Sequence, residues 1–165
     1  MNKLHTQVGA ALARGLGQVL VGIDYMCFPS EVAHALDASE LDGEVALHFE
    51  SAPSLYMTWT QNSGWLDVNS LIASSESQFR PGTLTRVPAN SHALWATHIG
   101  SKMVGAEVLG WQGTPSIARL HFSHGSVLVG VGRESAFRDG DCVLIRSDEP
   151  KWLFAGEFAV TLWRT

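Results

Sequence analysis

Two stretches that share a central tripeptide decide the expected fold: Val45-Ala-Leu-His-Phe-Glu-Ser51 and Ala118-Arg-Leu-His-Phe-Ser-His124. Leu-His-Phe recurs at a shift of 73 positions, and each stretch is followed by a turn and a second apolar run. Apolar and polar residues alternate from Val45 to Glu50, which is the period of a strand with one buried face. We therefore expect each stretch to open an antiparallel hairpin, the first running from Glu44 to Thr60.

A second similarity lies upstream of each hairpin, where Ala11–Met26 aligns without gaps with Leu94–Leu109 at a shift of 83 positions. The identical pairs are Ala13/Ala96, Gly17/Gly100, Val21/Val104 and Gly22/Gly105, and Asp24/Glu107 is a conservative pair. Because the order of the similar segments is the same, the sequence predicts two pseudo-repeats of helix, strand and hairpin. The halves span about 1–73 and 84–165 and are joined by a polar bridge at 74–83.

The 165 residues are enough for one ordinary domain, so we expect a single domain over residues 1–165. Periodicity predicts an α+β fold that is mainly antiparallel, with eight or nine strands and two or three helices. The second helix is expected at Ala89–Ile99, with Asn90 or Ser91 as its N-cap and Gly100 at its end. Most of the six Trp residues are expected in the core.

The charges are sorted along the chain. From Gly15 to Phe79 there is no Lys or Arg, while nine carboxylates occur, in a chain of net charge −5. They are Asp24, Glu31, Asp37, Glu40, Asp42, Glu44, Glu50, Asp67 and Glu76. A solvated face that keeps the protein soluble explains such acids, and so does a surface that attracts a cationic partner. Nucleic acid is not an expected partner, because phosphate neutralisation needs Lys and Arg.

The acids are densest where the two repeats differ in length. The first repeat has ten more residues than the second between its strand and its hairpin, at Pro29–Gly43. A short helix capped by Ser30, with Val32, Ala35 and Leu36 packed inward, would leave these acids on its solvent-exposed face. Inserted elements on a rigid scaffold also commonly carry binding residues. The candidate partner-binding residues are Glu31, Asp37, Glu40, Asp42 and Glu44, with Tyr56 and Trp65 as aromatic anchors.

No recognised motif points to catalysis, a cofactor or a metal. The seven histidines lack Cys-x-x-Cys or His-Glu-x-x-His spacing, and His48 is expected to stack or to pair with Glu50. Gly-x-Ser-x-Gly is absent, and the glycines do not gather in a loop before a helix. We expect no metal, no cofactor and no catalytic residue, and the sequence leans against an enzyme.

The remaining features concern the compartment. Cys27 and Cys142 lie in apolar strand-like segments and are expected as buried free thiols of a cytoplasmic protein. The apolar run near the start is too short for a secretory signal, and no stretch reaches the length of a membrane span.

Three functional hypotheses follow. The first is a non-enzymatic binding protein whose acidic surface occupies a basic protein partner, such as a nuclease-type toxin held by its immunity protein. The second is a small-ligand binder or enzyme with an apolar cavity between sheet and helices, lined by Trp59, Trp95 and Trp111. The third is a structural or oligomerisation module, monomeric or homodimeric, that uses an open strand edge.

Overall fold

The computed structural model describes residues 3–37, 40–61, 69–111, 114–132, 142–147 and 158–164. The helices are α1 (Lys3–Gly15), the 3-10 helix η1 (Pro29–His34) and α2 (Ala93–Ala96). The strands are β1 (Leu20–Cys27), β2 (Glu40–Leu41), β3 (Gly43–Phe49), β4 (Leu55–Gln61), β5 (Asn69–Ser74), β6 (Thr85–Pro88), β7 (Met103–Trp111), β8 (Thr114–Phe122), β9 (Gly125–Val131), β10 (Val143–Arg146) and β11 (Phe158–Arg164). The mainly antiparallel α+β class is thus confirmed.

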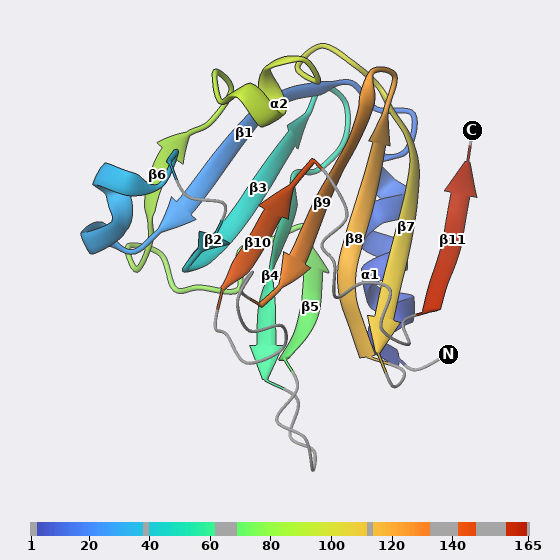
Figure 1. Cartoon of the computed structure of the whole chain (residues 1–165), viewed down its shortest axis with the longest axis horizontal. Coiled ribbons are helices and arrows are strands. Elements are labelled where there is room, and N and C mark those ends of the chain that lie inside the picture. Colours follow the sequence, from blue (N-terminus) through green and yellow to red (C-terminus); the bar gives the residue numbers. More distant parts are fainter. Residues whose placement is uncertain are drawn as a thin grey trace.

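The strands form two sheets that face each other (Figure 1). One has the order β5-β4-β3-β1-β6 and the other β11-β7-β8-β9-β10-β2. Helix α1 packs against β5 of the first sheet and against β7 and β8 of the second. The sheets contain five and six strands, more than the eight or nine predicted in all, because the short strands β2 and β6 add to the edges. None of the helices in the described ranges could cross a membrane.

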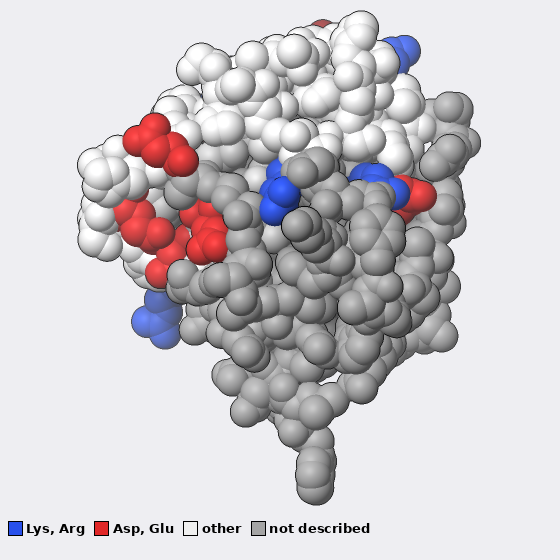
Figure 2. Space-filling view, in the orientation of Figure 1, with Lys and Arg blue, Asp and Glu red and all other residues white. Residues whose placement is uncertain are grey.

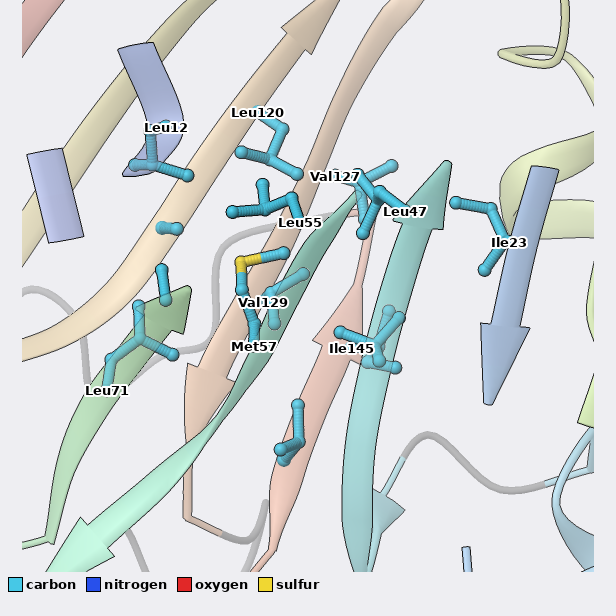
Figure 3. Close-up of a cluster of buried hydrophobic side chains, with 14 of the residues drawn as sticks. Leu12, Ile23, Leu47, Leu55, Met57, Leu71, Leu120, Val127, Val129 and Ile145 are labelled. Carbon is cyan, nitrogen blue, oxygen red and sulfur yellow. The ribbon is translucent and has the colours of Figure 1, made fainter. Parts of the chain in front are cut away.

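One apolar core fills the space between the sheets. Figure 3 shows Leu12 of α1 beside Leu120 of β8, with Leu55 and Met57 of β4 nearby. All four side chains are fully buried in one cluster with residues of both sheets. Strand alternation therefore turns the next residue of each strand, such as Asp24 beside Ile23, to the outer face of its sheet. The outer face of the second sheet carries Glu107 and also a small buried apolar cluster of Leu109, Ile117 and Leu128.

The expected elements upstream of each hairpin are partly corrected. Helix α2 is shorter than predicted, and its N-cap is His92, whose Nδ1 accepts a hydrogen bond from the Leu94 N–H. Asn90 instead accepts from the Ile23 N–H through its side-chain oxygen at 2.7 Å. Gly100 does end this segment, with a positive φ of 84°. Both cysteines are buried free thiols, as predicted. Trp95 is fully buried and Trp59 is half-buried, and the side chains of the other four Trp residues lie outside the described part, so a mostly buried Trp set stays a prediction.

The insertion forms η1 rather than an α-helix capped by Ser30. Its N-cap position is Phe28, with no side-chain hydrogen bond, and Pro29 opens the helix. Ala35 is buried as expected, but Val32 is 39% exposed and does not pack inward. Proline at the first position fixes φ for a helical start without the help of a capping side chain.

Candidate functional site

Each sheet buries one carboxylate on its outer face beside a histidine. Asp24 of β1 is 5% exposed and Glu107 of β7 is 6% exposed. An ionised carboxylate is rarely buried to this extent without partners, because it loses its hydration. Both carboxylates have such partners, and these define two polar clusters, the first relay around Asp24 and the second relay around Glu107.

The first relay consists of Ser54, His48, Asp24 and Arg86. His48 Nε2 lies 2.7 Å from Asp24 Oδ2, and the Arg86 Nε–H donates to the same oxygen at 2.8 Å. The other ring nitrogen, His48 Nδ1, lies 2.7 Å from the Ser54 hydroxyl oxygen. His48 thus pairs with Asp24 and not with Glu50, which corrects the expected pairing. The guanidinium and imidazole together compensate the buried carboxylate.

The second relay consists of Ser126, His121, Glu107 and Arg119. His121 Nε2 lies 2.8 Å from Glu107 Oε2, and an Arg119 N–H donates to that oxygen at 3.0 Å. Ser126 Oγ lies 2.8 Å from His121 Nδ1. Burial alone would raise the pKa of Glu107, but the His121 hydrogen bond and the Arg119 charge hold this pKa below its usual value. Glu107 is therefore an ionised carboxylate at neutral pH.

Strand register produces the same geometry in both relays. His48 is directly opposite Gly22 and His121 is directly opposite Gly105, and the carboxylate follows two residues after each glycine. A Cβ atom at Gly22 would lie 3.6 Å from the His48 ring. That is an ordinary van der Waals distance, and each histidine reaches the carboxylate diagonally across the two strands. The serine and arginine come from positions that do not correspond under the two shifts.

The carboxylates fix the protonation pattern of the imidazoles. Ionised Glu107 can only accept, so the hydrogen bond assigns the proton of neutral His121 to Nε2. The lone pair then lies on Nδ1 and accepts the hydroxyl proton of Ser126. The result is a chain of polarised hydrogen bonds from a guanidinium to a serine hydroxyl.

A hollow adjoins each relay. The first hollow has a volume of about 400 Å³ and is lined by Asp24, Met26, Ala46, His48, Tyr56 and Arg86. The second hollow has a volume of about 430 Å³ and is lined by Ala93, Leu94, Thr97, His98, His124, Gly125, Ser126 and Ser147. Different relay residues therefore line the two hollows: His48 and Asp24 line the first, and Ser126 lines the second.

His98 is an unusual part of the second hollow. It is 5% exposed and stacks on Phe122, with ring centroids 4.8 Å apart. Its Nδ1 is buried and has no hydrogen-bond partner within the described structure. Burial, with a smaller contribution from His124, lowers the pKa of His98, so this imidazole is neutral at neutral pH. A buried nitrogen without a hydrogen-bond partner is uncommon in proteins, which makes the second hollow a candidate functional site.

Four of the predicted acidic residues lie around the insertion, and none of these four is fully buried. Asp37 is exposed, and Glu31, Glu40 and Asp42 are half-buried. In Figure 2 acidic side chains gather where η1 and β2 lie. The Asp42 N–H donates to Glu31 Oε2 at 3.4 Å, so the two ends of the insertion are in contact. Tyr56 is half-buried and lines the first hollow, while Trp65 falls outside the residues that the structure describes.

Glu44 is not an exposed steering residue, which corrects its place among the candidates. It is 0% exposed and accepts hydrogen bonds from the Ser77 hydroxyl and, at 3.5 Å, from the Gln78 N–H. Burial raises the pKa of Glu44, and the two hydrogen bonds oppose this only in part. Glu44 lies on the same strand face as His48, but Ser77 and Gln78 of the chain after β5 cover it there.

Metal and family comparisons add no assignment. In the described ranges, no three His, Cys, Asp or Glu side chains are grouped so that they could hold a metal ion. A comparison of the chain with protein-family models, curated proteins and solved structures found no match. The relays were missed from sequence because each forms across strands. Their available signals were the Asp24/Glu107 and Gly22/Gly105 matches and the repeated Leu-His-Phe.

Proposed function

We propose that this protein is a binding protein whose acidic surface occupies a basic protein partner, as an immunity protein occupies a toxin. The acidic surface comprises Glu31, Asp37, Glu40 and Asp42. The observation that carries the proposal is that these four carboxylates lie on η1, the turn after it, β2 and the residue that follows β2, a region where acidic side chains gather in Figure 2. Grouped charges of one sign steer a partner of the opposite sign and accelerate its association.

The attachment of the insertion supports the proposal. Leu41 of β2 is 2% exposed, and its strand pairs with β10 at Val143 and Leu144. The acids at Glu40 and Asp42 therefore flank a side chain that is buried in the core. Carboxylates held on an anchored segment lose less conformational entropy on binding than those on a free loop.

Tyr56 supplies an aromatic group in the first hollow. The hollow includes Arg86 of β6, and β6 contacts η1. A partner that reaches over η1 can therefore also reach this hollow, where Tyr56 offers a rigid anchor with low entropy cost. The alternative of a small-ligand cavity lined by Trp59, Trp95 and Trp111 is less favoured, because Trp95 is packed in the core between the sheets.

The proposal is tested by the rate of association with a fluorescent oligolysine peptide. The triple variant Asp37→Ser, Glu40→Ser, Asp42→Ser is expected to slow association about tenfold at low salt, and salt should reduce the difference. The double variant Glu50→Ser, Glu76→Ser removes exposed acids elsewhere and serves as the control. Equal rates for the triple variant and the unmodified protein, with unchanged circular dichroism, would contradict the proposal.

We also infer that the fold descends from an internal duplication. Strand order β5-β4-β3-β1 in one sheet parallels β10-β9-β8-β7 in the other. The carboxylate, histidine and glycine of the two relays occupy corresponding positions. Antiparallel hairpins resemble one another for general reasons, but a shared diagonal pair opposite a glycine is a more specific similarity.

A further inference from the structure

We propose that Ser126 is a nucleophile that transfers the acyl group of a small ester to water. The proposal concerns a different set of residues from the acidic surface and stands independently of it. Three observations support it: the hydrogen bond of Ser126 to His121, the orientation of His121 by Glu107, and the second hollow beside the serine. A nucleophile, a base and a group that orients the base are the parts that nucleophilic catalysis requires.

The cross-strand register explains why Ser126 and His121 meet. They are directly paired across β8 and β9, one pair beyond Phe122 and Gly125, which border the hairpin turn. Directly opposite side chains on one face of a sheet lie close enough for hydrogen bonding. Arg119 is in turn directly opposite Glu107 across β7 and β8. The sheet therefore holds all four groups on rigid strands, a better support for a reacting geometry than a loop.

The second relay is the better candidate because its serine lines a hollow. Ser126 lines the second hollow, and its hydroxyl oxygen lies 2.8 Å from Nδ1 of His121. In the first relay the lining residues of the hollow include His48 and Asp24 but not Ser54. A substrate in the second hollow would thus meet the nucleophile directly, whereas one in the first would meet the base.

The first half of the reaction forms an acyl-enzyme. Ser126 Oγ bonds to the ester carbonyl carbon while its proton moves to His121 Nδ1 and the carbonyl electron pair moves to oxygen. Collapse of this oxyanion breaks the bond to the alkoxy group, which leaves as an alcohol with the proton from His121. Glu107 stabilises the imidazolium that exists between these steps.

The second half returns the serine. A water molecule attacks the acyl carbon and gives its proton to His121 Nδ1, and collapse releases the carboxylic acid as Ser126 Oγ takes that proton back. The sum is ester plus water to acid plus alcohol, with no oxidant or further reactant. His124 and Ser147 also line this hollow, and their side chains carry donors of the kind that stabilise an oxyanion.

The experiment uses the full chain, para-nitrophenyl acetate as substrate and a fluorophosphonate as covalent probe. We expect the probe to label Ser126, as located by peptide mass spectrometry. Ser126→Ala should lose labelling and at least about 100-fold of the catalysed hydrolysis. Ser123→Ala is the matched control, because Ser123 is an exposed serine of the same hairpin outside the relay. The Ser123→Ala variant should retain both the labelling of Ser126 and the hydrolysis of the ester.

His121→Asn provides a second variant that keeps the nucleophile. It should lower hydrolysis at least about 100-fold while Ser126 itself is unchanged, because the serine loses the base that accepts its proton. Thermal unfolding of each variant checks that the fold persists. Absence of labelling in the unmodified protein, labelling at Ser54 instead, or equal hydrolysis by Ser126→Ala would overturn the proposal, since surface histidines alone would cause the last result.

Discussion

At the scale of single residues, Trp95 and Tyr25 form a buried polar pair outside the relays. The Trp95 indole N–H donates to the Tyr25 hydroxyl at 2.9 Å, and both side chains are buried. This bond joins α2 to β1 and satisfies two groups that would otherwise be costly to bury. The tyrosine hydroxyl is withdrawn from water, and burial raises the pKa of Tyr25 to about 12, although the Trp95 hydrogen bond acts in the opposite direction.

That shift predicts a loss of stability in alkali. In the unfolded chain the tyrosine hydroxyl ionises near its ordinary pKa of 10.0, while folded Tyr25 keeps its proton until about 12. Between these values the folded state binds the additional proton, so the free energy of unfolding falls as pH rises, by about 1.4 kcal/mol for each pH unit. Urea unfolding measured across this range, followed by tryptophan fluorescence, checks the slope.

Tyr25→Phe is the matched variant for this experiment. It cannot ionise at this position, so its unfolding free energy should lack that part of the alkaline slope. At neutral pH it should be less stable by about 1–3 kcal/mol, because the Trp95 N–H loses its buried acceptor. A Tyr25→Phe protein with the same alkaline slope as the unmodified protein would show that another group is responsible.

At the scale of elements, the hairpins were predictable and the short edge strands were not. Alternation from Val45 to Glu50 identified β3, because a strand with one buried face carries its own signal. Strand β2 has only two residues, and its partner β10 lies about a hundred residues further along the chain. Strand β2 forms because it pairs with the strand next to it in the second sheet, so its own two residues carry no comparable sequence signal.

The same limit applies to the candidate site. The sequence identified Asp24, Glu107 and the two Leu-His-Phe segments as repeated features, but not their contact. The sequence favours Glu50 as the partner of His48, because residues two apart share one face of a strand. The register instead places Gly22 opposite His48 and brings Oδ2 of Asp24 to 2.7 Å from Nε2 of His48. Register between strands depends on the whole sheet, so a single strand does not disclose it.

Strand β3 and the chain after β5 are coupled through Glu44, which leads to a prediction. The raised pKa of Glu44 means that the folded state holds a proton more tightly than the unfolded state. Stability contributed by the protonated form is therefore lost as pH rises through the folded pKa. Glu44→Gln keeps an acceptor for Ser77 and has no charge to bury, so we expect it to be more stable than the unmodified protein at neutral pH.

The expected gain should shrink as pH falls through the raised pKa of folded Glu44 towards the ordinary value of 4.5, because the unmodified folded side chain takes up its proton over that range. Chemical denaturation at neutral and acidic pH measures this difference. Glu50→Gln removes an exposed carboxylate just after the same strand and should change stability little at either pH. A Glu44→Gln protein that is less stable at neutral pH would mean that hydrogen bonds to ionised Glu44 outweigh the cost of its burial.

At the scale of the whole molecule, the two halves share one core. The main cluster of buried residues contains Leu47 and Met57 of the first sheet and Leu120 and Val129 of the second. Helix α1 contributes Leu12 to the same cluster, so this helix of the first repeat packs on strands of the second. Each sheet therefore depends on the other to bury its inner face, whatever the origin of the halves.

A shared core predicts that the molecule unfolds as one unit. Leu12→Ala should lower the free energy of unfolding by about 2–5 kcal/mol, because it leaves a cavity where α1 meets both sheets. Gln7→Ala changes an exposed position of the same helix and should shift stability by no more than about 0.5 kcal/mol. Tryptophan fluorescence and far-ultraviolet circular dichroism should give coincident denaturation curves for each protein. If Leu12→Ala separated the curves into two transitions, the halves would be independent folding units, and the single-domain prediction would be wrong.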